Sequence, residues 1–236
     1  MNRRQFLRAA LATLSAAGCT LNAPVRAPAQ APGAVPPPAT PTPPPMPTIV
    51  PRAAWGARDP NPDAAMESGP FGWHVYEGDL AQVYRTVAIH HSAHRLASNK
   101  TMRDLQDIHM DRNQWADIGY HYGIDAQGVV YAGRDIRVRG SSVAGYNTGT
   151  IGVVVMGNFE VEQPLPTQLD SLRTLVVWLA HTFRLTHLAA HGEFNPDSVC
   201  PGRFMQQHLD ALAAAAGLLR GTGGYVPPVE NAVPGA

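Results

Sequence analysis

The chain has 236 residues, of which 44% are hydrophobic, so it can build one sizeable core and still leave residues for tails. Its 18 basic residues balance its 18 acidic ones, which argues against the strongly basic surface of a nucleic-acid-binding protein. No apolar run reaches the ~18–20 residues that a membrane span needs. Two cysteines, Cys19 and Cys200, are too few for a disulfide framework, and we expect them to have separate roles.

The first 19 residues predict export from the cytoplasm. They read MNRRQFLRAALATLSAAGC, in which a basic start precedes a short Ala/Leu stretch and small residues, as in a secretory signal. Residues 3–7 (RRQFL) resemble a twin-arginine signal, and residues 16–19 (AAGC) resemble a lipoprotein cleavage box. We therefore expect a protein of the periplasm or cell envelope, attached to the membrane only through a lipid on Cys19. The alternative is a plain cleaved signal in which Cys19 is incidental.

The next segment, residues 20–47, is predicted to be an extended, disordered linker. It is rich in Pro, Ala and Thr and has almost no large apolar residue, so it cannot bury a core. At ~3.1 Å per residue in polyproline geometry it would span roughly 80 Å. The last residues, 220–236, are also predicted to be disordered. The folded domain is therefore predicted to occupy residues 48–219.

Within this domain, the first half alternates short strands with a helix. Residues 83–91 (VYRTVAIHH) are β-branched and predict a strand. Residues 101–114 predict a helix that starts with Thr101 and Asp104 as a capping-box variant. Residues 120–124 and 129–131 predict a hairpin around the sequence DAQG.

The second half continues the same mixture. Residues 151–156 (IGVVVM) predict a buried strand, and residues 167–184 predict a helix with Thr167 and Asp170 as its cap. A short strand over 188–190 and an Ala/Leu-rich helix over 203–219 follow. Strands and helices thus mix along one core, which predicts a single α/β domain.

Histidine is frequent, with ten residues, and several lie beside predicted elements. A catalytic zinc site uses three protein ligands and one open position. The candidate ligands are His90, His91, His94, His109, His121, His191 and Cys200. Strand alternation favours His90 over His91, because His90 shares the smaller and more polar face with Thr86 and Ala88. Taken alone, these residues leave a metal site and a set of structural histidines both open, and the spacing of His109 fits a core position on its helix.

Several stretches, in order, resemble the type 2 N-acetylmuramoyl-L-alanine amidases and peptidoglycan recognition proteins. The resemblance covers roughly residues 49–215, and the order of its pieces makes it specific. The pieces are PRAAWGA (51–57), AIHHS (88–92), WADIGYHY (115–122), GVVYAGRD (128–135), GYN (145–147), IGV (151–153) with GNF (157–159), HGEFNP (191–196) and CPG (200–202).

This resemblance implies a central mixed β-sheet flanked by helices, with Zn²⁺ in a surface groove. It implies His90, His191 and Cys200 as zinc ligands and Tyr120 as a catalytic residue that stabilises charge on the amide oxygen. The implied reaction is hydrolysis of the amide between N-acetylmuramic acid and L-Ala, with peptidoglycan or muropeptides as substrate. We expect a monomer.

The resemblance also implies substrate contacts. Arg134 and Asn147 resemble positions that line the peptidoglycan groove, where Arg would pair with a stem-peptide carboxylate and Asn would bind the peptide backbone. A surface arginine and a turn asparagine are the alternatives. His91, His94 and His121 are expected at most to support the ligands.

The chain departs from the family pattern in one place. Many family enzymes have Lys or Thr two residues before the third ligand, whereas this chain has Ser198, and its only lysine is Lys100. Asp197 or Ser198 would then take the polar role, or Glu193 would act as the general base. The alternative function is a recognition module that binds peptidoglycan without cutting it. Members that only bind typically lack the cysteine ligand, so Cys200 favours the enzyme.

Overall fold

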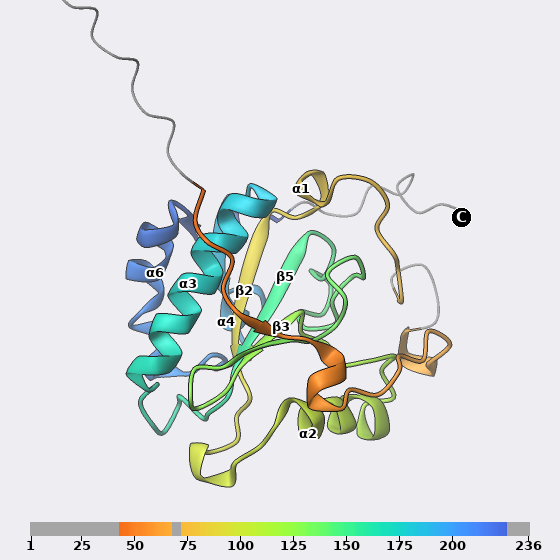
Figure 1. Cartoon of the computed structure of the whole chain (residues 1–236). Coiled ribbons are helices and arrows are strands. Elements are labelled where there is room, and N and C mark those ends of the chain that lie inside the picture. Colours follow the sequence, from red (N-terminus) through yellow and green to blue (C-terminus); the bar gives the residue numbers. More distant parts are fainter. Residues whose placement is uncertain (1–42, 68–71, 226–236) are drawn as a thin grey trace, which may run out of the picture. The chain divides into compact units, whose positions relative to one another are not determined.

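The computed structural model of the chain describes residues 43–67 and 72–225 (Figure 1). The predicted signal sequence, the lipidation of Cys19 and most of the predicted linker lie outside these residues. In the described part, we find no helix that is both long and apolar enough to cross a membrane.

A seven-stranded sheet forms the centre of the domain, in the order β1-β4-β3-β5-β2-β6-β7. Its central strands β5, β2 and β6 are parallel, whereas β3 and β4 form the predicted hairpin and pair antiparallel. The predicted single α/β domain with a mixed sheet is thus confirmed. The strands are β1 (Ile49–Val50), β2 (Thr86–His91), β3 (Tyr122–Ile124), β4 (Val130–Ala132), β5 (Thr150–Val155), β6 (His187–Ala190) and β7 (Leu219–Arg220).

Helices cover both faces of this sheet, and two of them, α3 and α6, lie side by side on one face (Figure 1). Val87 and Ile89 point from β2 into the main core, where they join Leu175 and Leu179 of α3. The α-helices are α1 (Leu80–Val83), α2 (Met102–Asp107), α3 (Pro166–Phe183), α4 (His191–Phe194), α5 (Arg203–Gln206) and α6 (Leu209–Ala216). The described residues also form the 3₁₀ segments η1 (Arg52–Trp55), η2 (Ala65–Glu67) and η3 (Leu96–Ser98) and the π-helix η4 (Ile108–Arg112).

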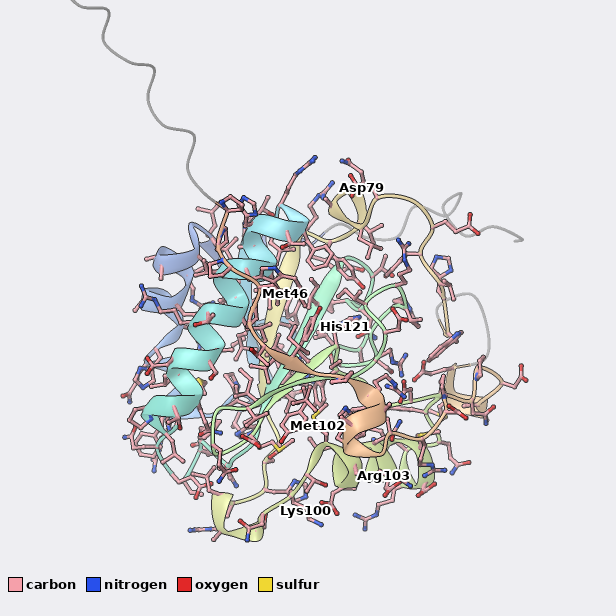
Figure 2. The ribbon with its side chains drawn as sticks, viewed as in Figure 1. Met46, Asp79, Lys100, Met102, Arg103 and His121 are labelled. Carbon is pink, nitrogen blue, oxygen red and sulfur yellow. The ribbon has the colours of Figure 1, made fainter. Side chains whose placement is uncertain are left out.

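The opposite face of the sheet carries the residues of even number in β2. Ala88 packs with Ala189 and with Phe194 of α4. Farther along this face, Met102 of α2, labelled in Figure 2, packs with Ile118 and with Val154 of β5. Since successive strand residues alternate between faces, His90 follows Ala88 onto this second face.

Two predicted helix starts have different outcomes. Thr101 caps α2 as predicted, because its hydroxyl accepts from the Asp104 backbone and the Asp104 carboxylate accepts from the Thr101 N–H. The predicted cap at Thr167 is wrong. Helix α3 begins at Pro166, whose fixed φ suits the first helical position, and the Gln168 side chain accepts from the Leu165 N–H.

The C-terminal part also differs from the prediction. Residues 203–219 form two short helices, of which α6 ends where Gly217 adopts a left-handed conformation with φ 67°. The chain then adds strand β7 to the sheet, so described structure extends beyond the predicted boundary at residue 219. The last described residue, Tyr225, donates a hydrogen bond to the Gly145 carbonyl at 3.0 Å.

Candidate metal centre and active site

Three segments bring His90, His191 and Cys200 together. His90 lies near the end of β2, and His191 is the first residue of α4, directly after β6. Because β2 and β6 are parallel neighbours with Ile89 opposite Ala190, the next residues, His90 on β2 and His191 at the start of α4, lie side by side. Cys200 reaches the same place from the loop between α4 and α5. The ligand atoms of the three residues all lie within 4.8 Å of one another.

Backbone hydrogen bonds hold the loop that carries Cys200. The His91 N–H donates to Cys200 Sγ at 3.3 Å, and the Gly192 N–H donates to the Cys200 carbonyl at 2.8 Å. Gly192 is required for this close approach, since a Cβ there would lie 2.5 Å from the Ser198 carbonyl oxygen. The sulfur is thus fixed against both β2 and α4.

The donor set fits a metal ion of the zinc type. His90 Nδ1 lies 3.8 Å from Cys200 Sγ. Bond lengths of ~2.1 Å to nitrogen and ~2.3 Å to sulfur would separate two tetrahedral ligand atoms by about 3.6 Å. Among the described residues, the buried His90 Nε2 finds no hydrogen-bond partner. One ring nitrogen of this buried imidazole is therefore left without a protein partner in the described part of the chain.

Burial also sets the protonation of the three ligands. It lowers the pKa of His90 and of His191, which keeps both rings neutral and free to offer a lone pair. It raises the pKa of the Cys200 thiol to about 12, although the hydrogen bond from His91 opposes this shift. A cation at this position would favour the thiolate, so binding of a metal would release a proton.

Tyr120 lies beside this group. Its ring centroid is 5.0 Å from that of His90, and burial raises the pKa of its phenol, which stays protonated as a hydrogen-bond donor. His109 also packs against Tyr120, at 5.4 Å between ring centroids, and its Nδ1 accepts from the Gly119 N–H at 2.9 Å. His109 is buried, as the sequence indicated, but its contact with Tyr120 was missed.

The candidates for proton transfer have partners in the ligand loop. Ser198 Oγ accepts from the Cys200 N–H at 3.3 Å. Glu193 Oε2 accepts from the Ala190 N–H at 2.6 Å and forms an ion pair with Arg220 at 2.8 Å. In this geometry both side chains hold the polypeptide around His191 and Cys200.

Arg134 has a different environment from the substrate-binding position that the sequence suggested. It is only 1% exposed, and its guanidinium forms a bidentate ion pair with Glu67, with both N–O distances at 2.7 Å. It also donates to the Ile118 carbonyl at 2.8 Å. Through these contacts, Arg134 holds together the loop segments on either side of it. Protein atoms enclose its side chain.

Asn147 does lie at a cavity, but its side chain also has a structural role. Its Oδ1 accepts from the backbone N–H groups of Ser142 and Val143, at 2.8 and 2.7 Å. Arg139 lines the same cavity. The sequence analysis did not identify it, because no sequence pattern distinguishes it from an ordinary surface arginine.

The other predicted supporting histidines bind backbone groups. His91 Nδ1 accepts from the Phe159 N–H at 3.2 Å, and His121 Nδ1 accepts from the Gly152 N–H at 3.1 Å. His121 lies in the interior of the domain (Figure 2). His94 contacts the Ser92 carbonyl at 2.8 Å. Of the three, His91 alone adjoins the ligand group, through its backbone.

Comparisons with known proteins agree with this geometry. A family model described as N-acetylmuramoyl-L-alanine amidase matches residues 80–203, which is more than half of the chain. Peptidoglycan-recognition protein LB of Drosophila melanogaster is 31% identical over 163 residues, which are 65% of this chain and 64% of that protein. The endolysin of Escherichia phage T7 is 35% identical over 120 residues, 49% of this chain and 78% of the endolysin.

Solved structures show the same fold. The structure of wild-type Drosophila PGRP-LB superposes with a TM-score of 0.55 at 29% identity, over 68% of this chain and 92% of that one. The amidase LysC from Clostridium intestinale gives a TM-score of 0.54 at 26% identity, over 62% and 94% of the two chains. The match spans just under two thirds of the Drosophila relative's full sequence. Fold, ligand geometry and sequence together place this chain in the N-acetylmuramoyl-L-alanine amidase family.

Proposed function

We propose that the chain is a zinc-dependent amidase that hydrolyses the bond between N-acetylmuramic acid and L-Ala in peptidoglycan. The observation that carries this proposal is the convergence of His90, His191 and Cys200 within 4.8 Å, next to the protonated phenol of Tyr120. Similar structures support peptidoglycan fragments as ligands. Human PGRP-IβC, at 27% identity, was solved with glycosamyl muramyl pentapeptide, and a mutant of Drosophila PGRP-LB, at 28%, with tracheal cytotoxin.

His90, His191 and Cys200 would hold the zinc. Bound zinc acts as a Lewis acid toward a carbonyl and makes water a nucleophile near neutral pH. The chain supplies the environment for this chemistry. The His91 N–H stabilises negative charge on Cys200 Sγ, and burial keeps the two imidazoles neutral.

Tyr120 would act on the substrate directly. Because burial raises its pKa, the phenol keeps its proton at neutral pH and can donate to the amide oxygen as that oxygen gains negative charge. His109 positions the ring, since it packs against Tyr120 and accepts from the backbone of the preceding residue, Gly119.

The test is to incubate the full-length chain with purified muropeptides, with and without a chelator, and to detect free stem peptide by mass spectrometry. Chelator-sensitive release of a peptide that starts at L-Ala is the expected result, with recovery on adding Zn²⁺. Cys200→Ala should lose the zinc and the release while keeping its fold. The matched control His181→Ala, on the exposed side of α3, should keep both. Binding of muropeptide without release, in the zinc-loaded chain, would instead establish a recognition module.

A further inference from the structure

The edge strand β7 brings a cationic side chain to the segment that carries His191. This strand runs parallel to β6, and Arg220 lies opposite Leu188. Arg220 also lies beyond residue 203, where the family match ends. Its guanidinium therefore comes from a part of the chain that the family match does not cover.

One nitrogen of Arg220 contacts the polypeptide on both sides of His191. Nη1 donates to the Leu188 carbonyl at 2.8 Å, before His191 in the chain, and to Glu193 Oε2 at 2.8 Å, after it. Nε donates to Asp210, an exposed carboxylate of α6, at 2.9 Å. The guanidinium thus joins β6 to α4 across the turn in which His191 lies.

Glu193 connects Arg220 to the start of the helix. The same oxygen that Arg220 binds, Oε2, accepts from the Ala190 N–H at 2.6 Å. Ala190 is the N-cap residue of α4, and His191 is the first residue of this four-residue helix. Because so short a helix is not stable by itself, contacts from outside must hold it in place. The Glu193 carboxylate, fixed by Arg220, supplies one of these contacts.

His191 depends on its turn more than the other two ligands depend on their surroundings. His90 lies in β2, between β5 and β6, and Cys200 Sγ accepts from the His91 N–H. Within the part of the chain that the structure describes, the His191 ring has no hydrogen-bond partner and packs on the His90 ring, at 4.7 Å between centroids. Ligating histidines usually have their second nitrogen held by a hydrogen bond. Here the backbone of the turn must place the ring instead.

We propose that Arg220 is a positioning residue for the metal centre, which acts through Glu193 on the turn that carries His191. The inference rests on the proposed function for the metal itself. Without the guanidinium, the Glu193 side chain, which is 30% exposed, would be free to turn toward solvent. The turn would then hold His191 in its binding position for a smaller fraction of the time, and the affinity for the ion would fall by that fraction.

The test measures the dissociation constant for Zn²⁺ of the metal-free, full-length chain, by competition with a chromogenic chelator. Arg220→Met should bind Zn²⁺ about tenfold more weakly than the wild type, the lower end of the effect expected for a group that orients a ligand. Arg220→Lys keeps a cation opposite Glu193 and should lose less affinity. The matched control is Asp210→Asn, which removes the other carboxylate partner of Arg220, is 88% exposed and should leave the affinity unchanged.

A double variant tests the route through Glu193. In a chain that already carries Glu193→Gln, adding Arg220→Met should weaken Zn²⁺ binding by no more than about twofold, because the ion pair is already lost. Three results would overturn the inference: Arg220→Met binding Zn²⁺ as tightly as the wild type, Arg220→Lys binding as weakly as Arg220→Met, or single effects that add in full. A wild type that binds no Zn²⁺ would overturn it together with the proposed function. The expected loss in Arg220→Met, found with a zinc-loaded wild type that releases no stem peptide, would uphold the inference and refute the amidase.

Discussion

The buried ion pair between Arg134 and Glu67 permits a quantitative test of the fold. The side chains of Arg134 and Glu67 are 0% and 4% exposed, and two hydrogen bonds of 2.7 Å join them. Arg134→Met would leave the Glu67 carboxylate buried without its cation and would free the carbonyls of Ile118 and Arg139. Removing one partner of a buried pair costs about 3–5 kcal/mol of the free energy of unfolding.

Urea denaturation of the full-length chain, followed by circular dichroism, measures this loss. The double variant Glu67→Leu/Arg134→Met should recover most of it, since no unpaired charge remains. Lys100→Met is the control, because its ion pair with Asp104 is exposed and spans 3.7 Å, and it should cost less than about 0.5 kcal/mol. The reasoning fails if Arg134→Met costs less than about 1 kcal/mol, or if the double variant is less stable than Arg134→Met alone.

Three further predictions concern the active site, pH and export. Tyr120→Phe should lower kcat by about 10²–10³-fold with unchanged zinc content, and an unchanged kcat would remove Tyr120 from the mechanism. Below pH 6.5 the metal-free chain should lose stability, because burial lowers the pKa of His109 and of His121 from 6.5 to about 4, so unfolding takes up protons as pH falls through this window. These two histidines alone should contribute up to about 2.7 kcal/mol per pH unit to the slope, and unfolding curves that coincide at pH 7 and pH 5 would contradict it. We also propose export through the signal in residues 1–19, so replacing residues 3 and 4 by Lys-Lys should leave unprocessed precursor in the cytoplasm, whereas normal processing would indicate the general secretory route.

The sequence predicted best where a local period decides the structure. Alternation along 83–91 placed His90 and Ala88 on the face away from the main core, as the structure has it. The start of α2 was predicted from Thr101 and Asp104, which are three residues apart and interact locally. The resemblance indicated His90, His191 and Cys200 as ligands, and the structure brings them together, although zinc itself stays a prediction.

The sequence predicted least where the partner is distant or the backbone departs from a regular period. Glu67, the partner of Arg134, lies 67 positions earlier in a polar loop, and no local pattern connects the two. The π-helix that carries His109 widens one turn, but His109 still fits the spacing of an ordinary helix when only the letters are read. At α3, the N-cap residue Leu165 has no side-chain oxygen by which the sequence could identify it. The sequence analysis therefore predicted the cap at Thr167 instead.

The half-buried guanidinium of Arg139 donates to the Gly72 carbonyl and has no carboxylate partner among residues 43–67 and 72–225, which marks a position where the domain could be made more stable. Met66 lines the same cavity as Arg139 and is 68% exposed, so an acidic residue there could reach the guanidinium from the solvent side. Such a substitution would place an opposite charge beside the half-buried guanidinium and should raise the melting temperature. Natural proteins are rarely at their stability optimum, and this unpaired guanidinium is one place where the present domain falls short of it.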